Sequence, residues 1–423
     1  MRFYSTKNKS DFFSFSAAAL GGLAPDGGLF VPEEIPEYPK AVLSSLGTMD
    51  YCDIAFETIK PYVFKDIPDS VLEDIIRDAY PFNAPLVDVG GRLILELFHG
   101  PTAAFKDFGA RFMARSFAYL RRNEDKPLRI LVATSGDTGG AVADGFFEVP
   151  GISVTVLYPK GRITPLQEKQ IAGLGGNITA LAVEGSFDDC QCLVKAALAD
   201  ENLKKKTTLS SANSINISRL IPQIAYYSAA AGKAFPITFC VPSGNFGNLT
   251  AGLYAMKMGA PIIQFIAATN INKTVPDYLS SGEYKARMSQ VTISNAMDVG
   301  APSNFERMTA HFSWEEMRKI ILGICVSDDE TRETISRVYN KEGYFLDPHT
   351  AVGWKAVDKL IMENKIPSGP IGILSTAHPA KFSETVVPLT GQIPVPPSLT
   401  RAMSRKVNSQ VISADICELL EFI

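Results

Sequence analysis

From residue 129 onward, short runs of apolar, often β-branched residues alternate with segments of helical periodicity, and Gly, Pro or Asn turns separate them. This pattern predicts strands at 129–134, 153–158, 178–183, 237–241, 262–268 and 370–374. It predicts helices at 139–148, 165–174, 187–198, 218–231 and 249–258. Short apolar strands separated by helices form parallel sheets covered on both faces. We therefore predict an α/β protein with two sheets, because one sheet holding every strand would be unusually wide.

The region before this pattern differs from it. Residues 69–80 repeat apolar residues at helical spacing, and Asp69 is the expected N-cap of a helix. Pro-rich stretches at 32–39 and 81–85 lie on either side of this region. We therefore predict a small N-terminal unit at 1–80.

The main region is predicted to span 81–390 and to form two lobes, the smaller of them at about 125–235. Ser313 and Glu316 have the spacing of a capping box ahead of an amphipathic helix. The run Pro394-Val-Pro-Pro then marks a break in the chain. We expect the rest of the chain, residues 391–423, to form a C-terminal tail that contains this break.

Charge and cysteine usage argue against several classes of function. The 423 residues carry a net charge of -4, so we expect neither nucleic acid nor an anionic membrane as a partner. Six cysteines make no disulfide framework, and no histidine stands near the closest pair, Cys190 and Cys192. We expect no metal site and a cytoplasmic setting. The apolar stretch at 12–24 is interpreted as folded structure, since no window holds the ~18 apolar residues that span a bilayer.

A glycine-containing turn, VPSGNFGN at 241–248, lies directly between a predicted strand and a predicted helix. Glycines let the backbone approach an anion, and the helix N-terminus favours negative charge, so this turn is a candidate phosphate site. It has neither the Gly-Lys-Ser/Thr ending of a nucleotide P-loop nor GxGxxG spacing, so ATP and NAD are poor candidates. The alternative is a tight turn without a ligand.

A second turn, TSGDTGG at 134–140, has the same position between strand and helix and is a candidate site for another anion, such as a substrate carboxylate. Ordinary turn chemistry is the alternative.

Lys106, in HGPTAAFKDFGARF, follows a Pro-Thr turn at the mouth of an apolar helix. A lysine with a depressed pKa forms Schiff bases. Together with one phosphate site, it suggests pyridoxal phosphate as a cofactor.

The chain resembles the threonine synthases, which are pyridoxal-phosphate enzymes of fold type II with a two-lobed, tryptophan synthase β-like architecture. The resemblance runs nearly from end to end. The glycine-rich turns are shared across the fold group, whereas GLAPDGGLFVP and SANSINISR are much more specific to threonine synthases. The matching segments are SFSAAALGGLAPDGGLFVP, LELFHGPTAAFKDFGARF, ATSGDTGGAVA, LYPKGRITPLQEKQ, SANSINISRLIPQIAYY, VPSGNFGNLTAG, FIAATNINKTVP, SNAMDVGAPSNFER and STAHPAKF.

The resemblance implies a set of cofactor contacts. Lys106 would hold pyridoxal 5'-phosphate as an aldimine, and Thr376 would face the pyridine nitrogen, unless its hydroxyl only caps the next turn. Asp137 stands where many relatives have Asn beside the ring oxygen, and a carboxylate there would repel a phenolate. Either that oxygen is protonated or Asp137 turns away. The cofactor phosphate would lie on the backbone of Gly244, Asn245, Phe246, Gly247 and Asn248.

The resemblance also implies a substrate, O-phospho-L-homoserine, whose phosphate would lie on Asn213, Ser214, Arg219 and Thr138, with Ser135 in the same turn as Thr138. The alternatives are a surface ion pair for Arg219 and helix capping for Asn213 and Ser214. The roles of His99 and His378 stay open between structural support and proton transfer.

The expected reaction converts O-phospho-L-homoserine and water into L-threonine and phosphate, by γ-elimination and then β-addition of water, with Lys106 moving the protons. One alternative is a phospholyase that releases 2-ketobutyrate. The other is a non-catalytic binding protein. This alternative is less favoured because the chain keeps Lys106, the 244–248 turn and Thr376. Monomer and homodimer are both left open.

Overall fold

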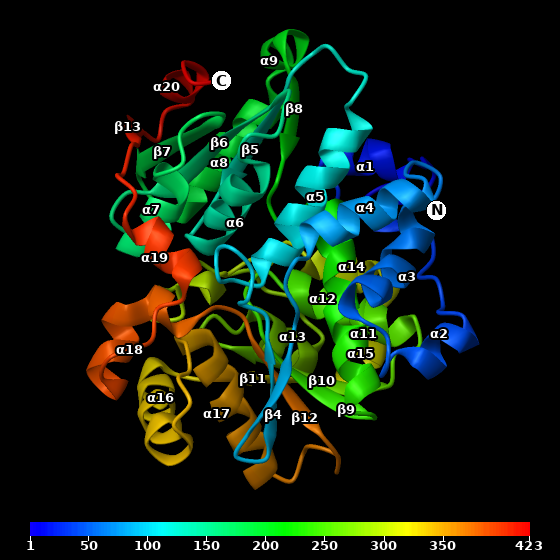
Figure 1. The fold of residues 1–423 in the computed structure, drawn as a ribbon, viewed down its shortest axis with the longest axis vertical. Coiled ribbons are helices and arrows are strands. Elements are labelled where there is room, and N and C mark those ends of the chain that lie inside the picture. The colour runs from blue at the N-terminus through cyan, green and yellow to red at the C-terminus, as the bar shows by residue number, and fades with distance from the viewer.

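The computed structural model describes residues 1–423 and contains two main sheets, one above the other in Figure 1. The larger sheet has the strand order β11–β10–β9–β12–β4–β3. Its β3–β4 hairpin is antiparallel, and all other neighbours are parallel. The strands are β3 (Leu86–Val89), β4 (Arg92–Glu96), β9 (Ile237–Pro242), β10 (Ile262–Thr269), β11 (Ile321–Cys325) and β12 (Ile371–Ser375).

The smaller sheet has the order β13–β7–β6–β5–β8, and all of its strands are parallel. The α/β fold with parallel-rich sheets is confirmed, and the six predicted strands correspond to β5, β6, β7, β9, β10 and β12. The others in the two sheets were not predicted. The strands of the smaller sheet are β5 (Leu128–Ala133), β6 (Ile152–Pro159), β7 (Ile178–Glu184), β8 (Thr208–Ser211) and β13 (Gln410–Ser413).

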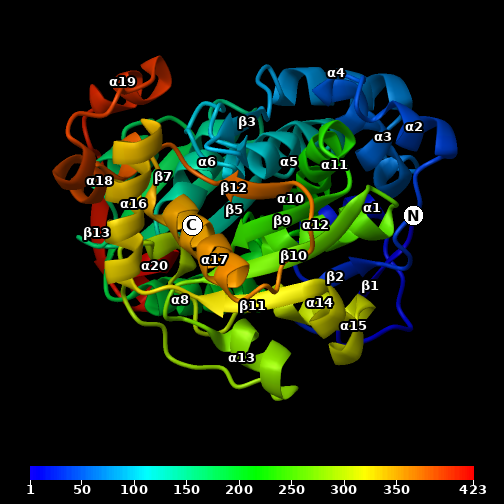
Figure 2. The same ribbon diagram turned by 90° about the horizontal axis from the view of Figure 1, so that it is seen from below.

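Helices cover both faces of each sheet, so side chains along a strand alternate between two apolar environments. In β5, Ile130 belongs to the core shared with α5 and α6, whereas Leu131 packs with α8. In β9, Phe239 faces α11 and α12, and Cys240 faces α17. Figure 2 shows α11, α12 and α17 beside β9. These helices are α5 (Lys106–Leu120), α6 (Asp137–Phe146), α7 (Pro165–Ala172), α8 (Phe187–Ala199), α11 (Ile224–Lys233), α12 (Gly247–Lys257) and α17 (Pro348–Met362).

The first 80 residues form a small helical layer that shares the main core. Phe3 and Phe15 are fully buried in the same apolar cluster as residues of α5 and α11. Helix α3 packs against α11, and α4 packs against α5. The layer is therefore continuous with the main region in its packing. Its elements are β1 (Phe3–Ser5), α1 (Phe15–Gly21), β2 (Phe30–Pro32), α2 (Lys40–Ser45), α3 (Tyr51–Val63) and α4 (Asp69–Ala79).

Local sequence signals explain several helix ends. Ser313 and Glu316 form the predicted capping box at the start of α15 (Trp314–Ile320). The prediction of Asp69 as an N-cap is wrong: Pro68 holds that position with extended backbone, and α4 begins at Asp69. The proline ring restricts Pro68 to this backbone geometry, so the helix starts one residue later.

The single helix predicted at 218–231 is also wrong. The chain forms α10 (Ile217–Leu220), a 3-10 turn η1 (Ile221–Gln223), and then α11. Pro222 lies inside the turn and has no backbone N–H to continue an α-helical ladder. The break leaves Arg219 on a short helix of its own, α10.

The segment expected as a C-terminal tail folds back onto the smaller sheet. Helix α19 (Pro397–Met403) packs on α7, and β13 pairs with β7. Helix α20 (Ile416–Leu420) then packs on α8. The remaining elements are α9 (Glu201–Lys206), α13 (Thr274–Ser281), η2 (Asn295–Met297), α14 (Phe305–His311), α16 (Asp328–Glu342), η3 (Pro379–Phe382) and α18 (Ser383–Thr390).

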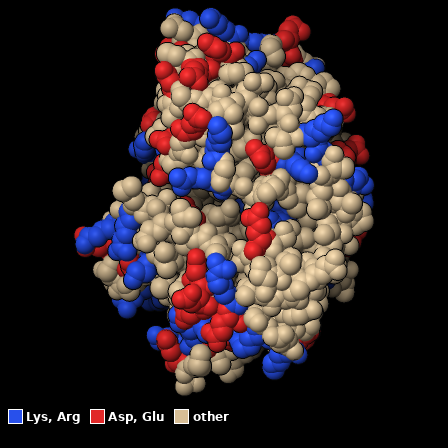
Figure 3. All heavy atoms as spheres, turned by 90° about the vertical axis from the view of Figure 1, so that its left-hand side faces the viewer, with Lys and Arg blue, Asp and Glu red and all other residues tan.

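Positive and negative side chains are interspersed over the face shown in Figure 3. None of the helices combines the length and the apolar character that a membrane crossing requires.

Candidate active site

The carboxyl ends of neighbouring strands converge on one open cavity of about 1020 Å³. In the larger sheet β12 lies between β9 and β4, and in the smaller sheet β5 lies beside β8. Parallel strands place their carboxyl ends at the same edge, so turns distant in sequence meet here. All the predicted site residues line this cavity, namely Lys106, Ser135, Asp137, Thr138, Asn213, Ser214, Arg219, Gly244, Asn245, Phe246, Gly247, Asn248 and Thr376.

The turn after β9 leaves a row of backbone donors free at the start of α12. None of the N–H groups from Gly244 to Asn248 donates a hydrogen bond within the protein. Phe246 has a left-handed backbone, with φ 59°, and caps α12 without a side-chain hydrogen bond. The Asn248 Oδ1 accepts from the hydroxyls of Tyr226 and Tyr227, each at 2.7 Å, while its buried Nδ2 has no acceptor. This arrangement suits an anion.

The turn after β5 is fixed by Thr134. Its Oγ1 accepts from the N–H groups of Gly136, at 2.9 Å, and Gly139, at 2.8 Å. Gly136 has φ 131°, a backbone geometry that only glycine adopts without strain. The turn directs Ser135 and Thr138 toward the cavity.

The turn after β8 places one buried cation in the cavity. The Asn213 amide bonds both backbone groups of Ala133, so it ties β8 to the end of β5. Arg219 is 2% exposed and donates from NH1 to the Ala212 carbonyl at 2.8 Å. Its buried Nε has no acceptor, and no carboxylate pairs with it. Burial lowers the pKa of Arg219 to about 10. A buried, unpaired guanidinium is suited to an anionic ligand.

Lys106 begins α5 beside the end of β12. The Phe105 N–H donates to the Thr376 carbonyl at 2.8 Å, so the start of α5 is attached to the strand that carries Thr376. The Lys106 side chain is 13% exposed. Burial lowers the pKa of its amine; the nearby charge of Asp137 opposes this, and the charges of Lys381 and Arg219 reinforce it. The depressed pKa expected of a reactive lysine is therefore present.

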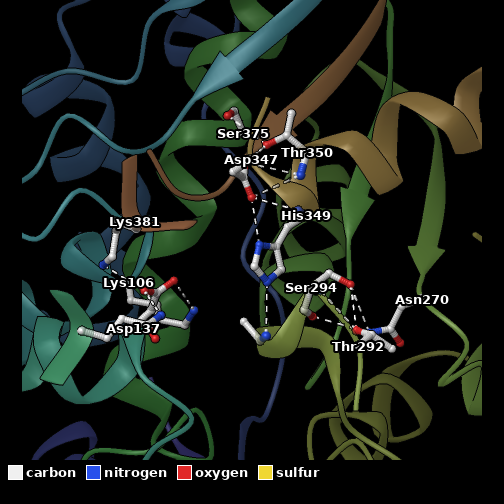
Figure 4. A network of polar contacts seen from close by, with 12 residues as sticks. Lys106, Asp137, Asn270, Thr292, Ser294, Asp347, His349, Thr350, Ser375 and Lys381 are labelled. Atoms are coloured by element: carbon white, nitrogen blue, oxygen red, sulfur yellow. Dashed lines mark hydrogen bonds and ion pairs between the residues drawn. The ribbon is translucent and has the colours of Figure 1, made fainter. Parts of the chain in front are cut away.

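Asp137 lies between two lysines (Figure 4). Its Oδ1 is 2.8 Å from Lys381 Nζ and accepts from Gln167 Nε2 at 2.9 Å, and its Oδ2 is 3.6 Å from Lys106 Nζ. Burial acts to raise the pKa of Asp137, but the charges of Lys381 and Lys106 outweigh it and hold that pKa well below its usual range. Asp137 is thus ionised and turned toward the lysines.

A buried histidine forms another part of the cavity wall. The Nδ1 of His349 is 2.8 Å from Asp347 Oδ1, and its Nε2 accepts from the Ala296 N–H at 3.2 Å (Figure 4). Asp347 also accepts from the Thr350 hydroxyl, whose oxygen lies 3.0 Å from Ser375 Oγ and can accept from it. The network joins the start of α17 to the segment around Ala296, against which Gly244 packs.

Arg307 links the turn after β8 and the turn after β9 to the N-terminal layer. It is fully buried and donates to the carbonyls of Phe30, Ser214 and Ile215. It also donates to Asn304 Oδ1 at 2.7 Å, and the Asn304 N–H donates to the Asn245 carbonyl at 3.3 Å. The positions of both turns therefore depend on one buried side chain.

The sequence predictions missed Lys381, Gln167, His349 and Arg307. A weak signal existed for His349, because the Asp-Pro-His-Thr run of 347–350 has the form of a helix N-cap followed by proline. His99 and His378 do not line the cavity; the His99 ring contacts Glu96, and the His378 Nδ1 accepts from the Ala380 N–H.

Comparison with known proteins identifies the family. The chain matches family models for Pyridoxal-phosphate dependent enzyme at 87–377, Threonine synthase N terminus at 2–80, and Threonine synthase, C-terminal at 350–423. It is 42% identical to the threonine synthase of Escherichia coli (strain K12), covering 99% of this chain and 98% of that protein. The crystal structure of threonine synthase from Escherichia coli superimposes with a TM-score of 0.91 at 40% identity, covering 100% of this chain and 99% of the other. The crystal structure of PLP-bound threonine synthase from Brucella melitensis superimposes with a TM-score of 0.91 at 36% identity, covering 100% of this chain and 98% of the other. The chain therefore belongs to the threonine synthase family of pyridoxal-phosphate-dependent lyases.

Proposed function

We propose that this cavity converts O-phospho-L-homoserine and water into L-threonine and phosphate, with pyridoxal 5'-phosphate bound to Lys106. One observation carries the assignment: a single cavity holds a partly buried lysine and two separate anion sites, the free N–H row at 244–248 and Arg219. A cofactor phosphate and a substrate phosphate require two such sites.

The residues present fit the cofactor. Five unused N–H groups and the start of the 11-residue helix α12 suit its phosphate. The lowered pKa of Lys106 suits an amine that attacks an aldehyde. Thr376, 6% exposed at the end of β12, offers a hydroxyl to the ring nitrogen. When bound, pyridoxal phosphate withdraws electrons from the substrate and makes its Cα and Cβ protons acidic.

Lys106 is the proposed base and acid of the reaction. Its amine takes the proton from Cα and then one from Cβ, and it returns a proton at Cγ after phosphate has left that carbon. Water then adds its hydroxyl at Cβ and gives its remaining proton to the released phosphate, and Lys106 returns a proton to Cα. One amine serves each transfer at carbon because Lys106 stands at one wall of the cavity, where burial lowers the pKa of its amine.

The substrate is proposed to enter with its phosphate toward Arg219. The unused Nε and the second terminal nitrogen provide the fork that phosphate accepts. Ser214 and Thr138 supply hydroxyls from neighbouring turns, and Asn213 shapes the turn while its amide is engaged with Ala133. The N-terminal turn of α6, with Ser135, suits the substrate carboxylate.

A product assay tests the assignment. The purified chain with pyridoxal phosphate is given O-phospho-L-homoserine, and threonine, 2-ketobutyrate and phosphate are measured separately. Equal amounts of threonine and phosphate are expected. Phosphate with 2-ketobutyrate would instead identify a phospholyase, and no turnover by a chain that binds the cofactor would leave a binding protein.

A cytoplasmic setting belongs to the same proposal. Its support is that all six cysteines are free thiols, two of them, Cys192 and Cys417, exposed.

A further inference from the structure

We propose that Lys381 is a positioning residue of this site: its buried ammonium holds the Asp137 carboxylate and thereby sets the proton affinity of the Lys106 amine. The inference rests on the proposed function in taking Lys106 as the lysine that binds pyridoxal phosphate. It extends that function to a second lysine, which lies outside the cavity lining and acts through Asp137.

The contacts of Lys381 are those of a fixed charge. Its side chain is fully buried, and its Nζ is 2.8 Å from Asp137 Oδ1 and 2.8 Å from the Thr102 carbonyl. Gln170 donates to the same carbonyl at 3.0 Å. Lys381 therefore joins three segments: η3 after β12, the first turn of α6, and the turn that leads to Lys106.

The Asp137 carboxylate lies closer to Lys381 than to Lys106. Lys381 and Gln167 occupy Asp137 Oδ1, at 2.8 and 2.9 Å, whereas Lys106 is 3.6 Å from Oδ2, beyond a normal hydrogen bond. Lys381 and Gln167 thus hold the carboxylate oxygen that faces away from Lys106. The positive charge of Lys381 offsets part of the attraction that Asp137 exerts on an ammonium at Lys106, so the Lys106 amine loses its proton more easily than it would beside an unpaired carboxylate.

The other charges near these groups are few. Arg219, on α10, faces Lys106 and acts in the same direction as Lys381. Asp107, on the same helix as Lys106, accepts from the Thr102 N–H and hydroxyl at 2.9 and 2.6 Å. His378 lies three residues before Lys381 and also responds to its charge. Asp137 is the carboxylate that pairs with both lysines.

The inference predicts two shifts of opposite sign. Lys381→Met removes a neighbouring cation and releases Asp137 to Lys106, so the titration midpoint of the Lys106 amine rises by about 1–3 pH units. Asp137→Asn leaves two cations facing each other, so the midpoint falls. A general loosening of the site would not produce shifts of opposite sign.

The measurement is competitive labelling of the full chain, freed of cofactor, with acetic anhydride across a pH series, read at Lys106 by peptide mass spectrometry. Gln170→Leu is the matched control, because it removes a neutral donor from the Thr102 carbonyl and leaves every charge in place. Its midpoint is expected to equal that of the unmodified chain.

An unchanged midpoint in folded Lys381→Met would overturn the inference, as would an equal rise in Gln170→Leu. If Lys381→Met does not fold, the Asp137→Asn variant provides the test. A lower titration midpoint of the Lys106 amine in that variant supports the inference, and an unchanged midpoint refutes it. A separate visible-absorbance titration with pyridoxal phosphate, which uses Lys106→Ala as its blank, tests the proposed function. A shifted labelling midpoint without a cofactor band at Lys106 would therefore refute only the proposed function.

Discussion

Arg219 carries a buried positive charge, which is expected to lower the free energy of unfolding of the substrate-free protein by a measurable amount. Its pKa falls to about 10 from an ordinary value near 12.5. At 1.36 kcal/mol per pKa unit, this difference corresponds to about 3 kcal/mol of folding free energy. The folded pKa is the lower one, so the penalty is fully present below about pH 10 and disappears as the pH rises beyond it. At neutral pH the penalty is therefore complete.

Arg219→Met removes this charge and keeps a long apolar chain in its place. It also loses the hydrogen bond to Ala212, worth about 1 kcal/mol. The net expectation is a gain of about 2 kcal/mol in the free energy of unfolding of the substrate-free chain. The same change removes charged hydrogen bonds to the substrate phosphate, at about 1.5–3 kcal/mol each, so KM is expected to rise about 10- to 150-fold.

The assay is thermal unfolding with and without inorganic phosphate, together with steady-state kinetics. Phosphate is expected to raise the unfolding midpoint of the unmodified chain and to leave that of Arg219→Met unchanged. Arg307→Met is the matched control: Arg307 is equally buried, and burial also lowers its pKa to about 10, but its nitrogens bond Phe30, Ser214, Ile215 and Asn304. Removing those donors leaves buried carbonyls unpaired, so this variant is expected to lose stability.

A lower unfolding temperature for Arg219→Met than for the unmodified chain, in the absence of phosphate, would contradict a burial penalty at Arg219. Equal stabilisation of the variant and the unmodified chain by phosphate would contradict phosphate binding by this side chain. A normal KM would place the substrate phosphate elsewhere in the cavity.

Three further predictions concern single residues. In Gly244→Ala the new Cβ would lie 2.5 Å from the Ala296 carbonyl oxygen. Overpacking of this kind costs about 1–3 kcal/mol, so the affinity for the cofactor is expected to fall about 5- to 150-fold. Fluorescence titration with pyridoxal phosphate measures the Kd, and an unchanged Kd contradicts the prediction. Burial raises the pKa of Asp107 to about 6, so the ionised carboxylate destabilises the fold at neutral pH. Asp107→Asn should therefore raise the thermal unfolding midpoint at pH 7.5. This gain in the unfolding midpoint should vanish as the pH falls below about 4, where the carboxyl is protonated in both the folded and the unfolded chain. Ser313→Ala breaks the capping box of α15 and should cost about 1 kcal/mol in denaturant unfolding while leaving KM unchanged; a raised KM would show that α15 reaches the site.

The sequence predicted the parts of the fold that have local causes. The runs that became β5, β6 and β9 are apolar on both faces because helices cover them. Gly136 and Gly161, in the turns after β5 and β6, have positive φ, and Gly244 after β9 is needed for its close approach to Ala296. These signals lie within about ten residues. The capping box at Ser313 was predicted for the same reason.

What the sequence did not predict depends on contacts between distant segments. Lys381 looks like a surface lysine, and only the packing of η3 against α6 places it on Asp137, 244 positions away. Strand β13 has two exposed residues, Gln410 and Val411, and becomes a strand because the edge of β7 is available to pair with it. Arg307 likewise acquires its role from three carbonyls in two distant segments, at Phe30 and at Ser214 and Ile215.

The position of β12 in the larger sheet has a consequence for synthesis of the chain. β12 lies between β9 and β4, but β4 ends at residue 96 and β12 begins at residue 371. At roughly 5–20 residues per second, a ribosome needs about 15–55 s to cover that interval. During it, β4 has only the short hairpin partner β3, and β7 likewise waits for β13 at the end of the chain. Both sheets are completed only when translation is nearly finished, so the growing polypeptide presents open apolar strand edges to the chaperones that meet it.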